Sequence, residues 1–213
     1  MNSTRREFDG ELQDIDVTVA GLFGMVVEGL SDAARALLED RADVAETLAA
    51  RDRVVDGVYL DIEALVNRQI LLQAPVACDL RFLLSALRVV PELERSHDLV
   101  AQIAFRARGV PAGALSPAAS RLVRQMSDLA SAMWRAAADA WYWRDGSRAA
   151  VLDGHAGQLR GLRSYLDAEL VSGRMPVPVS MEMTLVTHAY DRLGAHAVNI
   201  ARRVGYLAGR QVA

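Results

Sequence analysis

The sequence predicts an all-α protein made of two tandem three-helix bundles that are related by an internal repeat. Three observations indicate this fold class. They are a long apolar stripe with helical spacing near the start of the chain, a break rich in proline and glycine near its middle, and a motif that occurs in both halves. The 213 residues are 52% hydrophobic, which is enough to fill the cores of two such bundles.

The first half contains three helical patterns. The first places its apolar residues at steps of three and four, which keeps them on one helix face; they are Phe8, Leu12, Ile15, Val19, Leu22, Val26, Leu30, Ala33 and Leu37. A helix of about thirty residues is ~45 Å long at ~1.5 Å per residue, a length that suits a bundle. A break at residues 39–41 precedes a second helix that reaches Ile70. Pro75 separates that helix from a third one over residues 76–108, which Pro91 is expected to kink.

Residues 109–117 form the predicted boundary between the halves, because this stretch holds two prolines and two glycines. Ser116 followed by Pro117 is typical of a helix N-cap with proline at the first helical position. The second half then repeats the scheme with helices over residues 117–144, up to about 171 and from about 177 to 210. We therefore expect one bundle over residues 1–110 and a second over residues 111–213.

The charge pattern excludes several classes of partner. The net charge is −3, with both signs spread along the chain, so we expect no nucleic acid to bind. All 24 basic residues are arginine, which is typical of GC-rich codon usage. The start lacks a signal-peptide pattern, and the apolar stretch of residues 17–27 is shorter than the ~20 residues of a membrane helix. We expect a cytoplasmic protein without membrane insertion.

Two residue types have structural interpretations. Cys78 cannot form an internal disulfide, because it is the single cysteine, and its helical surroundings predict a small core residue. Trp134, Trp141 and Trp143 have no counterparts in the first half. They are expected in the core or at a bundle end, and the alternative is a surface for a partner or a dimer.

Glu94, Asp98 and Gln102 are spaced by four residues, so they are expected along one face of the third helix, with neighbouring side chains roughly 5–6 Å apart. Two carboxylates so placed repel each other. An arginine from another helix, water or a hard metal cation would relieve the repulsion. A solvated acidic face and a metal site both remain open at this point.

The matching strip on the last helix has fewer acidic ligands. It contains Asp191, Ala195 and Asn199, with His188 and His196 nearby. Alanine cannot coordinate a metal and asparagine offers a neutral oxygen. We therefore expect any metal at the first strip, and hydrogen bonds or an arginine from a neighbouring helix at the second.

The two strips carry a resemblance to a known family. Residues 93–98, Leu-Glu-Arg-Ser-His-Asp, resemble the Leu-Glu-Arg-Ile-Gly-Asp motif of the PhoU family of phosphate-uptake regulators, and residues 191–200 resemble its second copy. The runs at residues 75–81 and 86–88 are similar to the segment that precedes the first motif. The resemblance covers residues 5–203.

The resemblance implies a pair of three-helix bundles that acts as a cytoplasmic adaptor, not as an enzyme. Its partners would be the ATPase subunit of a phosphate ABC transporter and a sensor histidine kinase, and its role would be to repress phosphate-starvation genes and phosphate uptake. A homodimer is expected. Some members bind iron or other divalent metals through the motif, which would place Glu94, Asp98 and Gln102 at the first site and leave Asp191 and Asn199 at a degenerate second one.

The sequence also departs from the family pattern. Ser96 and His97 replace Ile-Gly, Asp191 replaces Glu, and Ala195 replaces the Asp of the second motif. These changes are also compatible with a divergent paralogue that serves another transporter or kinase. Two further alternatives are a helical dimerisation module and a ferritin-like di-iron enzyme, for which Glu94 and His97 have the required Glu-x-x-His spacing.

Overall fold

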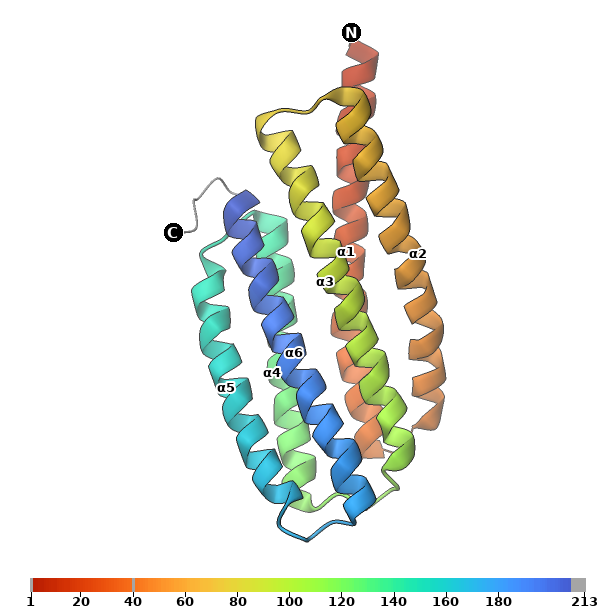
Figure 1. Cartoon of the computed structure of the whole chain (residues 1–213), viewed down its shortest axis with the longest axis vertical. Coiled ribbons are helices and arrows are strands. Elements are labelled where there is room, and N and C mark those ends of the chain that lie inside the picture. Colours follow the sequence, from red (N-terminus) through yellow and green to blue (C-terminus); the bar gives the residue numbers. More distant parts are fainter. Residues whose placement is uncertain (1, 40, 208–213) are drawn as a thin grey trace.

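The protein is an array of six long helices (Figure 1), seen here in a computed structural model that describes residues 2–39 and 41–207. The helices are α1 (Asn2–Glu39), α2 (Ala42–Gln73), α3 (Ala77–Arg106), α4 (Pro117–Trp143), α5 (Arg148–Leu170) and α6 (Val177–Leu207), with a 3₁₀ turn, η1 (Ala107–Gly109), after α3. The described part of the chain contains no strand. The predicted all-α class is confirmed.

The helices form two three-helix bundles that lie side by side (Figure 1). α1, α2 and α3 pack together, as do α4, α5 and α6, and the bundles meet where α3 packs on α6 and α1 on α4. One continuous hydrophobic cluster draws buried residues from all six helices. Because the core is shared, the division into domains at residues 110 and 111 stays a prediction, although residues 107–116 do connect the bundles.

Local signals set several helix ends as the sequence predicts. Ser116 caps α4, since its Oγ accepts a hydrogen bond from the backbone N–H of Ala119 at 3.1 Å, and Pro117 begins the helix. The Ser116 hydroxyl also donates to Glu169 Oε1 of α5 at 2.6 Å, which ties the start of α4 to the neighbouring helix. α3 continues without a break through Pro91. The predicted last residues of α6, 208–210, lie outside the described part of the chain.

The N-terminal apolar stripe supplies much of the first core. Ile15, Val19, Leu22 and Val26 of α1 are all buried. By length and composition alone, residues 5–39 form one helix that is apolar enough to cross a membrane, which the sequence expectation did not anticipate. In the fold Ile15, Val19, Leu22 and Val26 of this helix pack in the core.

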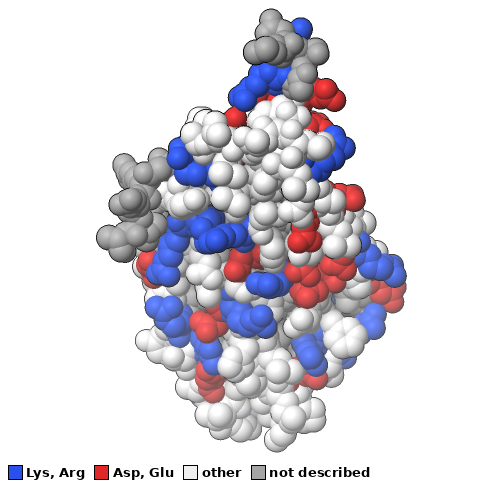
Figure 2. All heavy atoms as spheres, turned by 45° about the horizontal axis from the view of Figure 1, so that its top comes forward, with Lys and Arg blue, Asp and Glu red and all other residues white. Residues whose placement is uncertain are grey.

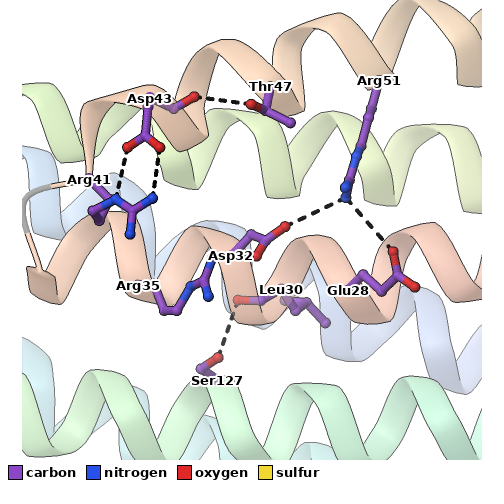
Figure 3. Close-up of polar contacts among 9 residues, drawn as sticks. All are labelled: Glu28, Leu30, Asp32, Arg35, Arg41, Asp43, Thr47, Arg51 and Ser127. Carbon is purple, nitrogen blue, oxygen red and sulfur yellow. Dashed lines mark hydrogen bonds and ion pairs between the residues drawn. The ribbon is translucent and has the colours of Figure 1, made fainter.

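Polar contacts also tie α1 to both of its neighbours (Figure 3). Arg51 of α2 reaches Asp32 and Glu28 of α1, with its Nη1 3.5 Å from Asp32 Oδ2 and 3.9 Å from Glu28 Oε2. Ser127 of α4 donates its hydroxyl hydrogen to the backbone oxygen of Leu30 at 3.4 Å. α1 is thereby held to its own bundle and to the second one.

Two expectations about single residues need correction. Cys78 is exposed, not buried, because it lies in the first turn of α3, near the tip formed by the α2–α3 connection. Trp134 and Trp141 are buried as expected, whereas Trp143, the last residue of α4, is 67% exposed. The tryptophans therefore divide between core packing and an open surface.

Candidate functional site

The first acidic strip faces α2. Glu94 and Asp98 of α3 are half-buried and lie near Asp52 and Asp56 of α2; we call these four residues the acidic cluster. Burial raises the pKa of Glu94, and the nearby charges of Asp98 and Asp56 raise it further. The pKa of Asp98 is also raised, first by burial and then by the charge of Asp52. The fold therefore brings together four carboxylates that repel one another.

No arginine in the described part of the chain forms an ion pair with this cluster. Arg51 points to α1 instead (Figure 3), and Arg95 approaches Glu92 with 4.0 Å between Nη1 and Oε1. A direct polar partner is His97, whose Nδ1 lies 2.9 Å from Oδ1 of Asp52. His97 is fully buried, and its Nε2 has no hydrogen-bond partner among the described residues.

The acidic cluster is not a preformed metal site. Among the described residues, no three His, Cys, Asp or Glu side chains are placed so that they could hold one metal ion. Gln102 is turned away from the cluster and lines a groove between α3 and α6. Eight residues of α-helix make about 80° more than two full turns. Gln102 therefore does not point in the same direction as Glu94.

The ferritin-like alternative has no assembled donor set among the described residues. Glu94 and His97 have the required spacing, but the His97 ring reaches Asp52, and no further Glu or His completes a di-iron arrangement there. The cluster gathers negative charge and lacks a metal-binding geometry.

The second acidic strip is neutralised by an arginine. Arg163 of α5 places its Nη1 2.9 Å from Oδ2 of Asp191 and its Nε 3.5 Å from Oδ2 of Asp167. The same guanidinium lies 3.4 Å from Nε2 of His188. Asn199 is exposed further along α6. The expected arginine from a neighbouring helix is confirmed, and the two halves differ in the charge that faces their motif.

The two residues that replace Ile-Gly in the first motif both make specific contacts. Ser96 is buried, donates its hydroxyl hydrogen to the backbone oxygen of Glu92 at 2.6 Å and lies 2.9 Å from Nδ1 of His196. His97 contacts Asp52 as described above. The Ser-His pair therefore joins the first motif to the second motif on one side and to the acidic cluster on the other.

Sequence reasoning missed Asp52, Asp56 and Arg163. Asp52 and Asp56 are spaced by four on α2, so an acidic strip on that helix was visible in the sequence. Which helix faces the strip depends on tertiary packing, and no local pattern singles out Arg163 as the partner of Asp191.

Comparison with known proteins agrees with the motif and the fold. The PhoU domain family matches residues 19–107. The chain is 26% identical to a phosphate-specific transport system accessory protein PhoU homolog of Zymomonas mobilis, over 98% of this chain and 90% of the relative. It is 28% identical to the homolog of Deinococcus radiodurans, over 95% of this chain and 96% of the relative.

Two solved structures share the whole architecture. The crystal structure of PhoU from Pseudomonas aeruginosa has a TM-score of 0.86 and 26% identity, over 94% of this chain and 98% of that one. The phosphate transport system regulatory protein PhoU from Streptococcus pneumoniae also has a TM-score of 0.86, with 25% identity over 97% of this chain and 99% of that one. With its two bundles, its repeated motif and these full-length similarities, the chain is similar to PhoU proteins over nearly its whole length, and its residues 19–107 match the PhoU domain.

Proposed function

We propose that this protein is a cytoplasmic adaptor and negative regulator of phosphate uptake and of phosphate-starvation signalling. It would contact the ATPase subunit of a phosphate ABC transporter and a sensor histidine kinase, and it would work as a homodimer without catalysing a reaction. The observation that carries this proposal is the similarity, over nearly the full chain, to proteins named as accessory proteins of the phosphate-specific transport system.

The surface of the protein supports a role in binding other proteins. Several large apolar side chains at the ends of the bundles are open to solvent, among them Leu71, Leu72 and Val76 at the α2–α3 tip and Trp143 at the end of α4. Exposed apolar groups of this kind are typical of surfaces that contact a partner. The described residues near the motif offer carboxylates, hydrogen bonds and arginines, and no activated nucleophile is apparent there.

Deletion of the gene tests the regulatory role. Cells that lack the protein are expected to express phosphate-starvation genes in phosphate-rich medium, and a plasmid copy of the wild-type gene should restore repression. Expression from a starvation-controlled promoter is the readout. Unchanged expression in the deletion strain would contradict the proposal.

Co-purification tests the partners. Tagged protein from phosphate-rich cells is expected to recover a transporter ATPase subunit and a histidine kinase, identified by mass spectrometry. Recovery of a different transporter or kinase would instead support a divergent paralogue. The Ser96–His97 pair and Ala195 favour that second candidate, because they depart from the family motif and Ser96 contacts His196 of the other bundle.

A further inference from the structure

A line of arginines follows the seam where α3 packs on α6. Arg88, Arg95 and Arg106 belong to α3, and Arg192 and Arg203 belong to α6; we call these five residues the basic seam. The two helices run in opposite directions here, since Ser96 contacts His196 and Arg106 contacts Glu182. From residue 88 to residue 106 the seam spans roughly 27 Å at ~1.5 Å per residue.

Electrostatic effects show that these cations are neighbours across the seam. The pKa of Arg203 is lowered by burial and then by the charge of Arg88 on the facing helix. Burial lowers the pKa of His196, Glu92 opposes this, and the charges of Arg192 on α6 and Arg95 on α3 lower the pKa further. The positive charges of the two helices therefore combine into one field.

Most of this positive charge is not neutralised locally. Within the described chain, Arg88, Arg192 and Arg203 form no ion pair with any carboxylate. Arg95 reaches Glu92 at 4.0 Å, and Arg106 reaches Glu182 at 3.4 Å. The whole protein carries a net charge of −3, so the basic seam has the opposite sign to the molecule.

The lower part of the seam is recessed. A groove between α3 and α6 has polar walls that include Gln102, Arg106 and Arg192. Its floor is formed by Leu99, Ile103, Val186 and Ala189, which are all buried, and its open apolar side chain is Leu185, which is 47% exposed. The surface thus combines cations with one exposed apolar side chain, which complements a helix that carries carboxylates beside a small apolar face.

The neighbouring acidic cluster limits what can cover the seam. Figure 2 shows basic side chains gathered on one part of the face turned to the reader, with acidic side chains to their right. A bilayer or a nucleic-acid duplex is broad enough to bring its phosphates against Asp52, Asp56, Glu94 and Asp98 as well, which repel them. A single helix, ~10 Å wide, covers the seam alone.

We propose that the basic seam binds an acidic amphipathic helix of a partner protein, with its carboxylates on Arg88, Arg192 and Arg203 and its apolar side chains in the α3–α6 groove. This inference rests on the proposed adaptor function and adds to it the surface and the chemistry of one partner. Long-range attraction would bring the helix to the seam, and contact with the exposed side chain of Leu185 would add to the binding.

A designed peptide tests the surface directly. The probe is a fluorescent 18-residue helix with leucines on one face and glutamates on the other, measured by anisotropy at low ionic strength. Binding is expected, and it should weaken as salt is raised because the exposed charges are screened. The same peptide with glutamine in place of glutamate should bind at least about tenfold more weakly.

Charge-reversal variants locate the binding site. Arg88→Glu combined with Arg192→Glu is expected to weaken peptide binding by about tenfold or more. The matched control combines Arg124→Glu on α4 with Arg202→Glu, which normally pairs with Asp153 of α5, and should change binding by less than about twofold. Equal binding by both double variants, or binding of anionic phospholipid vesicles but not of the peptide, would overturn the proposal.

Co-purification with the same variants separates this proposal from the function. If the seam variant and the control recover the same partners in equal amounts, the adaptor function stands and the seam proposal fails. If the seam variant loses one partner that the control retains, the proposal is supported. If even the wild-type protein recovers no transporter or kinase, the proposed function fails, and the peptide measurement alone decides on the surface.

Discussion

Ser96 of α3 lies with its Oγ 2.9 Å from Nδ1 of His196 of α6, so the repeated motifs of the two bundles touch each other at the seam. Ser96 uses its own hydrogen to donate to the backbone oxygen of Glu92. Its Oγ must therefore accept from His196, which assigns the hydrogen of the neutral ring to Nδ1. Glu92 Oε2 lies 3.6 Å from the same nitrogen.

Because His196 is largely buried at this junction, we expect the stability of the protein to depend on pH. Burial lowers the pKa of His196, so the folded protein holds the ring neutral in a range where the unfolded chain, with a pKa of about 6.5, already binds a proton. The unfolding free energy therefore falls as pH drops through 6.5 toward the lowered value. Replacing His196 with asparagine should remove this part of the pH dependence.

Urea denaturation at pH 7 and pH 5.5 measures the effect. The wild-type protein is expected to lose more stability between these two pH values than His196→Asn. A His155→Asn variant on α5 controls for the loss of a histidine away from the seam. A wild-type slope that persists in His196→Asn would contradict the assignment.

Neutralising a carboxylate should have opposite effects in the two bundles. Glu94→Gln and Asp56→Asn remove repulsion from the acidic cluster, so each is expected to stabilise the protein at pH 7 by a few tenths of a kcal/mol up to about 1 kcal/mol. Asp191→Asn removes the ion pair with Arg163 and should destabilise it by about 1 kcal/mol.

The pH dependence checks the cause of this difference. Because the pKa of Glu94 is raised in the fold, the folded state binds its proton more readily, and the repulsion appears as pH rises through the raised value. The advantage of Glu94→Gln should therefore shrink as pH is lowered toward 4. Equal stabilisation at both pH values would point to packing instead of charge.

Local sequence signals predicted the fold well. The apolar stripe of α1 and the Ser116–Pro117 cap depend on residues close together in the chain, so helical periodicity and capping rules apply to them. The prediction that Cys78 is a core residue was wrong, because periodicity cannot show that the first turn of α3 lies near an exposed tip. Trp143 is exposed for a related reason, since it is the last residue of α4.

The site was only half visible in the sequence. Glu94 and Asp98 follow from their spacing, and the deficit of carboxylates at the second strip follows from Ala195. Asp52 comes 42 residues before Glu94 in the sequence, and Arg163 comes 28 residues before Asp191. Such pairs are set by how helices pack, so only the structure shows that one bundle faces its motif with carboxylates and the other with arginine.

Gly146 marks a close approach between the α4–α5 turn and α6. A Cβ atom at this position would collide with the backbone of Gly205, which cannot move aside like a side chain. Gly146→Ala should therefore destabilise the protein by about 1–3 kcal/mol, measured by urea denaturation.

Gly154 provides the matched control for that substitution. It lies on α5, and a Cβ atom there would meet nothing within 4 Å. Because alanine favours a helix over glycine, Gly154→Ala should stabilise the protein by roughly 0.5–1 kcal/mol. Similar effects of the two substitutions would argue against the close approach at Gly146.

The asymmetry of the acidic strips predicts where a metal would bind. We expect iron or another divalent metal at the first repeat, because the acidic cluster holds negative charge that no arginine of the described chain neutralises, whereas Arg163 already neutralises Asp191. The carboxylates would have to move together, since they do not form a preformed site.

Elemental analysis of protein purified without chelator should find metal in the wild-type protein and in Asp191→Ala but not in Glu94→Ala or Asp98→Ala. Metal that is lost from Asp191→Ala and kept in Glu94→Ala would refute the prediction, and wild-type protein without metal would leave the cluster as a solvated acidic face.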